Sequence, residues 1–529
     1  MQNYVCRAML ATAVIAALFS CGRSKEPESA AVLRRAIGGE PSTLDPAAAA
    51  DTYSGDVIRD LYEGLTQETP LGDTAPGVAS SWTIDPTGTE YTFHLRPDAR
   101  WSNGEKVRAQ DFIAAWKRAL DPAHGFAGAE LLRVIVGASS IIDGKAPDSA
   151  LGVSALSDGL LVVRLAQPAP YLPQLLSNPA AFPIYSDVGA RSHDPRSWVS
   201  NGPYVLSGWS PGATVDLSRN PDYWDRSHVA IARVHYQVVP DDGAQYRQYR
   251  AGEVDMTDTV PAQAVAALRE SHSPDLLIAP FLGTVYYALN LSVPPLGSVK
   301  LRQALAMAID RKRITATLGF GQREAFGFVP PGTWNYTYQS WDWKNSSDSQ
   351  RTAQAKKFYR EAGYSAASPL RLRVLYNSNP GIQNVAVAVA SMWKEVLGVE
   401  SELTNEEYRV FLDSRHDRTH WDVARLSWSA DFNDASNFLD TFRSHSANND
   451  SSYQNASYDR VLDEAVSTSD PDKRKLLLQQ SEQIMLGDYP VIPLYHFVTK
   501  RLVKPYVHGV VLNPLNHLAS KSLSIAIER

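Results

Sequence analysis

The chain is too long to fold around a single hydrophobic core. It has 529 residues, and a single core stops growing at about 250–300 residues, beyond which chains divide into domains. Strand-like and helix-like segments are mixed along the whole length without an internal repeat, which is typical of an α/β or α+β architecture. We therefore expect at least two α/β lobes.

The amino terminus has the pattern of an export signal. Residues 1–20 contain one cation, Arg7, followed by an apolar run from Met9 to Phe19. A run of this length is too short to span a bilayer and is typical of the apolar region of a signal peptide. We expect residues 1–20 to be removed and residues 21–32 to form a polar tether, which places the mature protein in the periplasm.

Cysteine usage fits export with a lipid anchor. The only cysteines are Cys6, inside the signal, and Cys21, directly after it. The stretch Leu18-Phe19-Ser20-Cys21 resembles a bacterial lipobox, in which the signal is cut before the cysteine and the thiol is acylated; secretion with a spare cysteine is the alternative. Because Cys21 would be the single thiol left, we expect no disulfide and no cysteine-based metal site. We also expect no metal and no cofactor.

Charge and hydropathy exclude some classes of partner. The formal net charge is −6 and no basic stripe is present, whereas neutralising phosphates requires clustered Lys and Arg. We therefore expect no nucleic acid as a partner. After the signal, no segment approaches about 18 consecutive apolar residues, so we expect membrane contact only through the anchor. The 24 Tyr and 12 Trp suit wet binding clefts as well as cores.

Several segments predict individual helices and strands. Tyr91–Leu95 alternates apolar and polar residues, which predicts a half-buried strand, and Val423–Trp428 predicts another. Apolar residues at helical spacing predict helices over 111–120, 301–309, 385–396 with an end at Gly398, and 476–486 with a start at Asp470-Pro471.

A series of short motifs runs along nearly the whole of the expected mature chain. They are Ser42-Thr43-Leu44-Asp45-Pro46, Leu61-Tyr62-Glu63-Gly64-Leu65, Trp101–Val107, Asn201-Gly202-Pro203-Tyr204, Asn220–Trp224, Gly252–Asp255, Lys300–Leu305, Asp422–Asn433 and Arg501–Pro505. In this order, over about residues 33–528, they resemble the family of bacterial extracellular solute-binding proteins typified by oligopeptide- and dipeptide-binding proteins. The oligopeptide-binding branch is the most similar.

The resemblance implies a fold and a function. The fold is a two-lobed periplasmic-binding-protein fold, type II-like, with a hinge and an additional α+β domain. On this sequence, lobe I comprises 33–62, 184–289 and 498–529, the additional domain 63–183, and lobe II 290–497. The implied function is to capture short peptides between closing lobes and deliver them to the permease subunits of an ABC importer. We expect the protein to act as a monomer and not to be an enzyme.

A receptor for many short peptides has to bind the features that all peptides share. An extended peptide pairs its backbone with strand edges, and its charged ammonium group needs a partner once water is excluded. The resemblance implies Asp431 as that partner; judged from the residues alone, a capping or surface aspartate is the alternative. It also implies that Leu426-Ser427-Trp428-Ser429 forms the strand edge that pairs with the peptide backbone and that Trp428 lines a side-chain pocket. On the facing lobe, it implies Thr52 and Tyr53 as ligand-binding residues.

The far end of a peptide needs cations. The resemblance implies Arg425 and Arg415, since a guanidinium fork can bind a carboxylate bidentately; a structural salt bridge is the alternative for each. Tyr408 stands where relatives have a ring-stacking tryptophan. Ile382 replaces a histidine and Ala114 a ligand-touching tyrosine, which leaves peptide length and side-chain preference open.

Other functions remain as alternatives. His416 and His420 have i, i+4 spacing, but the glutamate of a metalloprotease helix is missing between them, and there is no Gly-x-Ser-x-Gly elbow, P-loop or dinucleotide fingerprint. A hydrolase is thus one alternative. Within the same fold, the ligand could instead be a cell-wall peptide, glutathione, or a nickel or haem complex, and an adhesion lipoprotein would keep the fold as well.

Overall fold

A computed structural model describes residues 31–185, 194–195, 198–365 and 367–526. The predicted signal peptide (1–20), the acylation site Cys21 and the tether up to residue 30 lie outside the described residues. Among the helices within the described ranges, none is long and apolar enough to cross a bilayer.

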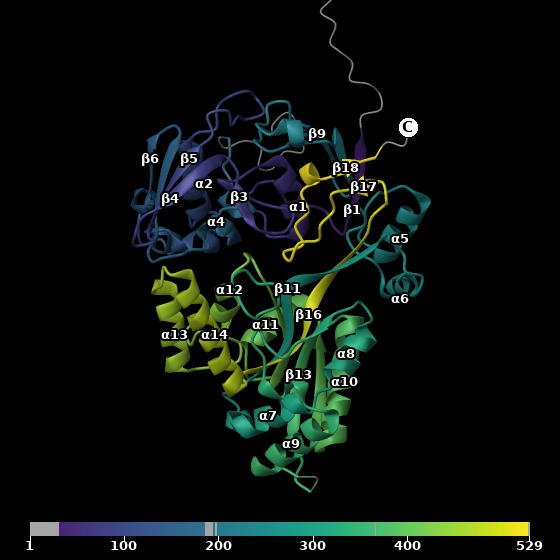
Figure 1. Ribbon diagram of the computed structural model, residues 1–529. Coiled ribbons are helices and arrows are strands. Elements are labelled where there is room, and N and C mark those ends of the chain that lie inside the picture. Colours follow the sequence, from purple (N-terminus) through teal and green to yellow (C-terminus); the bar gives the residue numbers. More distant parts are fainter. Residues whose placement is uncertain (1–30, 186–193, 196–197, 366, 527–529) are drawn as a thin grey trace, which may run out of the picture. The chain divides into compact units, whose positions relative to one another are not determined.

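One lobe is built on a four-stranded sheet with the strand order β1-β10-β9-β8. Figure 1 labels β1 and β9 of this sheet. β1 is parallel to β10, and the other neighbours are antiparallel. Helix α1 begins after Asp51, whose side chain accepts a hydrogen bond from the amide of Ser54, which satisfies one of the unpaired amides of the first turn. The elements are β1 (Val32–Ile37), α1 (Thr52–Leu61), β8 (Tyr204–Ser210), β9 (Thr214–Arg219), β10 (Arg233–Val238), α5 (Asp242–Ala251), α6 (Ala262–Glu270), β17 (Val507–His508) and β18 (Ser524–Ile525).

A second, antiparallel sheet with the order β4-β5-β7-β6 forms the additional domain. The predicted strand is confirmed as β5, in which Tyr91, Phe93 and Leu95 are buried, and the predicted helix 111–120 lies in α2. This domain shares one continuous core with the first lobe. Its elements, with the adjoining pair β2 and β3, are β2 (Thr66–Glu68), β3 (Thr74–Pro76), β4 (Ala79–Ile84), β5 (Glu90–Leu95), α2 (Ala109–Leu120), α3 (Ala138–Ile142), β6 (Val153–Ser157), β7 (Leu160–Arg164) and α4 (Leu172–Leu175).

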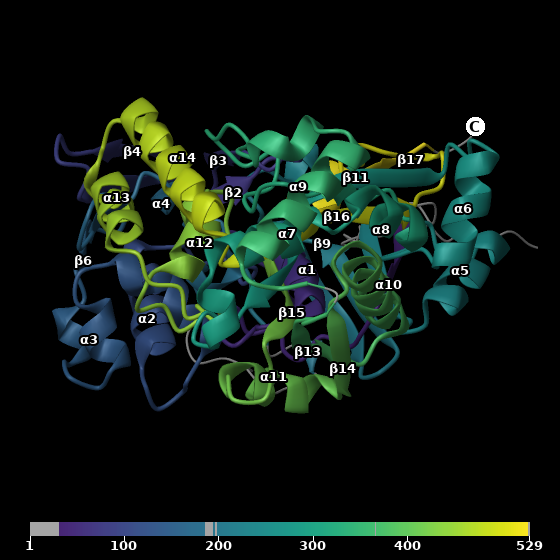
Figure 2. The same ribbon diagram turned by 90° about the horizontal axis from the view of Figure 1, so that it is seen from below.

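The other lobe has its own core around a six-stranded sheet with the order β12-β16-β11-β15-β13-β14. α10 packs on β13 and β14, and α8 packs on β12 and β16 (Figures 1 and 2). The elements are β11 (Leu276–Leu289), α7 (Val299–Met307), α8 (Arg311–Leu318), β12 (Arg323–Glu324), α9 (Asp348–Glu361), β13 (Arg371–Asn377), α10 (Pro380–Leu397), β14 (Glu400–Glu406), α11 (Tyr408–His416), β15 (Val423–Ser429), α12 (Ser436–Leu439), α13 (Ala456–Ser467), α14 (Pro471–Asp488) and β16 (Val491–Leu502).

The predicted ends of the helices in this lobe are confirmed. α10 ends at Gly398, which is left-handed at φ 79°, a conformation that glycine adopts without steric cost. α14 begins with Pro471, and the side chain of Asp470 accepts hydrogen bonds from the amides of Asp472 and Lys473. The predicted strand Val423–Trp428 is β15.

Two long strands, β11 and β16, run from one lobe to the other. Leu276–Pro280 pairs with Val498–Leu502, and Thr284–Ala288 pairs with Val491–His496, with an irregular register between Pro280 and Thr284. Such an interruption of a ladder bends the strands, and here it lies between the two cores. The fold is therefore two α/β lobes joined by a hinge, with an additional domain. The domain boundaries themselves stay predictions, because the crossing strands contribute to both lobes.

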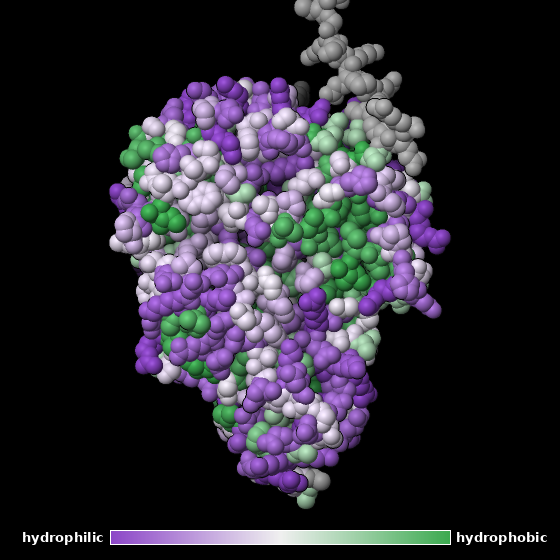
Figure 3. Space-filling model, viewed as in Figure 1, coloured by the Kyte–Doolittle hydropathy of each residue, from purple (hydrophilic) through white to green (hydrophobic). Residues whose placement is uncertain are grey.

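The start of β11 also presents apolar side chains at the surface. Its first residues, Leu276 to Phe281, are only partly buried, whereas the strand is buried from Leu282 onward. In Figure 3 an apolar patch lies over this part of β11 and the neighbouring carboxyl-terminal segment. Large exposed apolar patches commonly mark contact surfaces.

The buried carboxyl of Glu482 on α14 gives a testable pH dependence. It accepts hydrogen bonds from the amides of Phe328 and Val329 and from the hydroxyl of Tyr336, and burial raises its pKa to about 7, against an ordinary 4.5. As pH rises, the Glu482 carboxyl therefore ionises at lower pH in the unfolded chain than in the folded protein. The free energy of unfolding should fall by about 3 kcal/mol between roughly pH 4.5 and pH 7. Glu482→Gln, whose amide can keep these contacts, should remove that loss.

The measurement is denaturant unfolding of the wild-type protein and the Glu482→Gln variant at about pH 5 and about pH 8. The variant should match the wild type at the lower pH and exceed it at the higher one. Glu402→Gln on β14 is the matched control, because Glu402 is exposed. Equal pH dependence in all three proteins would contradict the assignment.

Candidate functional site

A cavity of about 460 Å³ lies where the two lobes and the additional domain meet. Its walls come from the segment that leads into α1, from the additional domain, from the end of β15 and from the carboxyl-terminal segment. The lining residues are Ala49, Ala50, Asp51, Thr52, Gly55, Arg59, Gly128, Glu130, Leu131, Asn178, Pro179, Ala180, Phe281, Ser429, Ala430, Asp431, Leu515, Asn516 and His517. The structure thus brings the predicted residues Thr52, Ser429 and Asp431 to one space.

Asp431 lies two residues beyond the end of β15. Its carboxylate is exposed to the cavity, and its one hydrogen bond is from the side-chain amide of Asn437, at 3.3 Å. Protein atoms surround the cavity, and this desolvation raises the pKa of the Asp431 carboxyl, an effect that the bond from Asn437 only partly offsets. A cation placed beside this carboxylate would favour its charged form.

The other two acidic side chains of the cavity already have strong partners. Asp51 accepts hydrogen bonds from Ser42 and from Ser54, and Glu130 pairs with Arg133 at 2.5 Å. Of the three carboxylates, Asp431 is therefore the one that is available to a cationic ligand group.

β15 offers a strand edge beside this carboxylate. The amide of Ala430 donates to the carbonyl of Leu282 on β11 at 2.9 Å, and backbone groups of successive residues point to alternate sides of a strand. Ser427 and Ser429 therefore direct their amide and carbonyl groups to the opposite edge. There β13 pairs only with the first two residues of β15, and in the described part of the chain no other strand covers the rest of that edge. Both serines are exposed.

On the facing lobe, the two predicted residues differ in their surroundings. Thr52 is exposed and lines the cavity. Tyr53 is not among the residues that line it; its ring lies against Gly38 and Gly39, where an added Cβ would come within 2.8 and 2.6 Å of the ring or its hydroxyl. Burial raises the pKa of the Tyr53 hydroxyl, and the nearby Asp258 raises it further.

The remaining predicted residues lie outside the cavity lining. Trp428 donates from its indole to Asn437 at 3.0 Å, so both Trp428 and Asp431 bind the same asparagine. Arg415 is 4.0 Å from the buried Asp450. Arg425 is half-buried in the middle of β15, opposite Tyr287. Tyr408 is exposed at the start of α11. Their contacts with a ligand stay predictions.

Arg415 and Arg425 do lie near one buried ring. Burial raises the pKa of Tyr286, the carboxylate of Asp450 raises it further, and both guanidinium groups lower it.

The segment after Asp431 is held against the additional domain. The ring of Phe432 stacks on Tyr171 with centroids 4.9 Å apart, and the side-chain amide of Asn178 donates to the carbonyl of Asp431 at 3.4 Å. Behind them, Arg474 pairs bidentately with Asp434, with both N–O distances 2.8 Å, and lies over the Tyr171 ring. The loop that carries the predicted ligand anchor, Asp431, is therefore fixed by contacts on both sides.

Polar or aromatic residues of the cavity that were absent from the sequence prediction include Arg59, Glu130, Asn178, Phe281, Asn516 and His517. For Arg59 a signal exists, since Thr52, Gly55 and Arg59 have i, i+3, i+7 spacing and share one face of α1. Asn178, Phe281 and His517 have no comparable local signal, because each reaches the cavity through packing between distant segments.

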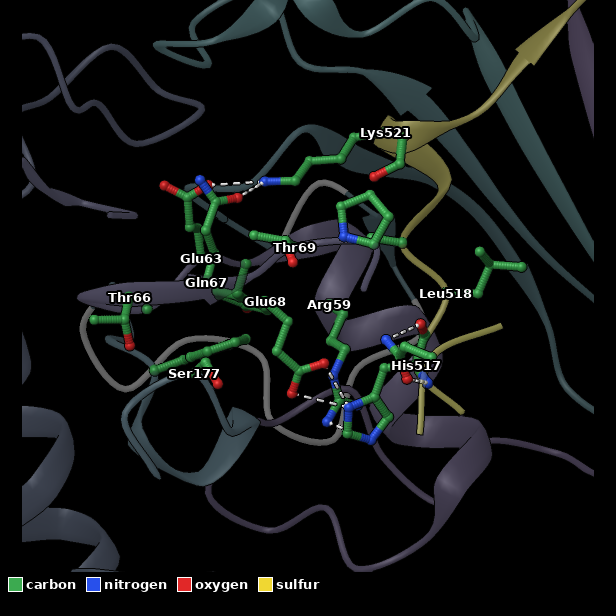
Figure 4. A pocket seen from close by; sticks show the side chains of 17 residues that line it. Arg59, Glu63, Thr66, Gln67, Glu68, Thr69, Ser177, His517, Leu518 and Lys521 are labelled. Carbon is green, nitrogen blue, oxygen red and sulfur yellow. Dashed lines mark hydrogen bonds and ion pairs between the residues drawn. The ribbon is translucent and has the colours of Figure 1, made fainter. Parts of the chain in front are cut away.

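A second, smaller cavity of about 50 Å³ shares Arg59 and His517 with the first (Figure 4). Figure 4 shows Lys521 directed at Glu63 and Gln67 on one side, and Glu68 directed at His517 on the other. This space holds no more than a few waters. The cavity of about 460 Å³ is the candidate ligand site because it is lined by the predicted residues Thr52, Ser429 and Asp431.

Over the described ranges, no group of three or more His, Cys, Asp or Glu side chains is arranged to hold a metal ion.

Comparisons with known proteins agree on one family. The model of bacterial extracellular solute-binding proteins, family 5, matches residues 73–450. The periplasmic oligopeptide-binding protein OppA of Escherichia coli is 34% identical over 99% of both chains, and the probable deoxycholate-binding periplasmic protein YgiS of Escherichia coli is 37% identical over 92% of both. A solved structure of the periplasmic murein tripeptide-binding protein MppA, in an unliganded open form, has a TM-score of 0.84 at 34% identity, covering 94% of this chain and 98% of that one.

Proposed function

This chain belongs to the bacterial extracellular solute-binding proteins of family 5, and on that premise we propose that it captures short peptides in extended conformation between its two lobes. The observation that carries the proposal is the shared cavity: the open carboxylate of Asp431 on one lobe and the start of α1 on the other line the same space. The ammonium group of a peptide matches the carboxylate, and the peptide backbone matches the unpaired edge of β15.

Hinge closure would complete the site. Bringing the lobes together excludes water, which strengthens a salt bridge between Asp431 and a ligand ammonium. Side chains of the ligand alternate along an extended backbone, so successive ones point to opposite faces of the sheet that the ligand extends. A hydrated cavity can accept many of them.

We also propose how the receptor is placed in the cell. Residues 1–20 act as the export signal, Cys21 is acylated, and the mature protein works as a monomer at a membrane facing the periplasm, where it delivers peptides to the permease subunits of an ABC importer. The relatives are binding proteins rather than enzymes, which supports a role without catalysis; turnover of model peptides by the purified protein would contradict it.

Native mass spectrometry of the protein with the ligands it carries from the cell tests the ligand class. A ladder of peptide masses is the expected result. A single mass corresponding to glutathione, a nickel or haem complex, or another non-peptide solute would overturn the proposal. A mass corresponding to a cell-wall peptide would restrict the ligand class to such peptides.

A bile salt is the second candidate ligand, because the relative YgiS is 37% identical and is described as probably deoxycholate-binding. Deoxycholate is an anion without an ammonium group, so it would meet the carboxylate of Asp431 as a like charge. It would also leave the edge of β15 unpaired. Peptide therefore fits the described groups better.

Acetylation of the ligand separates the two candidates. Because an N-acetyl group removes the positive charge that Asp431 is expected to bind, N-acetyl-trialanine should bind at least about 100-fold more weakly than trialanine. Isothermal titration calorimetry of both peptides and of deoxycholate measures this. Equal affinities for the two peptides, or tight binding of deoxycholate alone, would contradict the proposed peptide site.

A further inference from the structure

Arg59 places a cation on the wall of the ligand cavity opposite to the lobe that carries Asp431. It lies on α1, on the face shared with Thr52 and Gly55, and all three line the cavity. A Cβ at Gly55 would come within 2.9 Å of Nη1 of Arg59. Glycine at this position therefore leaves the space in which the guanidinium lies beside the helix.

A short hydrogen-bonded chain orients this guanidinium (Figure 4). Nη2 of Arg59 donates to Nε2 of His517 at 3.0 Å, and Nδ1 of His517 lies 2.8 Å from Oε2 of Glu68. Because arginine is always a donor, Nε2 is the acceptor, which puts the imidazole proton on Nδ1 and directs it to Glu68. Burial raises the pKa of Glu68, but the interaction with His517, including its hydrogen bond, and the positive charge of Arg59 outweigh burial and lower the pKa overall. Glu68 therefore stays an acceptor.

The orienting chain uses only one of the guanidinium's nitrogen atoms. Nε of Arg59 is buried, and neither Nε nor Nη1 has a hydrogen-bond partner among the described residues. A charged group with unsatisfied donors at the wall of a cavity gains free energy when an acceptor reaches it.

Charge and size limit what that acceptor can be. Asp51 and Glu130 already have partners, so the open charges of the cavity are the anion of Asp431 and the cation of Arg59. A sphere of 460 Å³ is about 10 Å across, which is the length of about three extended residues at roughly 3.4 Å each.

We propose that Arg59 binds a carboxylate of the ligand while Asp431 binds its amino terminus. The carboxylate is either an acidic side chain within the first residues or the carboxyl terminus of a di- or tripeptide. This inference rests on the proposed function, and it adds a preference for acidic or very short peptides that Arg59 enforces.

Matched ligand pairs test the role of Arg59 by calorimetry. Ala-Glu-Ala-amide against Ala-Gln-Ala-amide isolates the side-chain carboxylate, and trialanine against trialanine-amide isolates the terminal one. In the wild-type protein, the carboxylate form of at least one pair should bind about tenfold or more tightly. In Arg59→Gln that ratio should fall to about one, and the affected pair identifies the source of the carboxylate.

Two further variants distinguish a role of Arg59 in ligand binding from an effect on the fold. Arg59→Lys keeps the charge without the fork and should restore part of the preference, whereas Arg371→Gln, on the exposed β13 side chain, should leave it unchanged. An undiminished preference in a folded Arg59→Gln variant would overturn the inference. If N-acetylation still weakens binding in that case, only the role of Arg59 is wrong; if none of the peptides binds, the proposed function is wrong as well.

Discussion

Replacing Asp431 with alanine is expected to weaken binding of a peptide with a free amino terminus by two to three orders of magnitude. On closure the ligand ammonium would lose its partner and stay buried, which costs about 3–5 kcal/mol, and each 1.4 kcal/mol is about tenfold in affinity. Isothermal titration calorimetry with trialanine measures the change directly.

A double-mutant cycle makes this test specific. N-acetylation of the peptide should greatly weaken its binding to the wild-type protein and only slightly weaken its binding to the Asp431→Ala variant, because both changes remove the same ion pair. Glu130→Gln is the matched control, since Glu130 lines the same cavity but pairs with Arg133; its effect should stay below about tenfold. Unchanged affinity in Asp431→Ala would rule out the anchor.

The largest expected effect on stability comes from Arg474→Leu. Arg474 and Asp434 form a bidentate pair whose side chains are 4% and 1% exposed, and Asp434 also accepts from the amide and hydroxyl of Ser436. Removing the guanidinium leaves a buried, unpaired carboxylate, so the free energy of unfolding should fall by about 3–5 kcal/mol. Denaturant unfolding at neutral pH measures it.

Two controls separate the buried charge from lost packing. The double variant Asp434→Asn with Arg474→Leu should recover a large part of the loss, because no uncompensated charge remains. Arg460→Leu, at an exposed position of α13, should change stability by less than about 0.5 kcal/mol. If Arg474→Leu unfolds at the same denaturant concentration as the wild type, the pair does not stabilise the loop that carries Asp431.

Local chemistry was enough to predict several of the helices and strands and the place of the anchor. The start of α14 at Asp470-Pro471 and the end of α10 at Gly398 depend on side chains within a few residues, so the pattern of the chain contains them. The position of Asp431 after β15 follows in the same way from the strand that precedes it. Its role in ligand binding came from the family resemblance and stays a prediction.

What could not be predicted depends on contacts between distant parts of the chain. The hinge exists because β11 pairs with β16, more than 200 residues later in the sequence, on both sides of an interruption between Pro280 and Thr284, and no local pattern sets that register. His517 and Glu68 are likewise separated by 449 residues. The orientation of Arg59 likewise depends on His517, which is 458 residues later in the sequence.

The unpaired edge of β15 has a consequence outside transport. Any denatured chain carries the same row of amide and carbonyl groups as a peptide, and strand edges without a neighbour are sites of unwanted association. An empty receptor would therefore expose a place where stretches of misfolded protein can adhere, and a loaded one would not. We expect cargo to protect the receptor itself from aggregation in a crowded compartment.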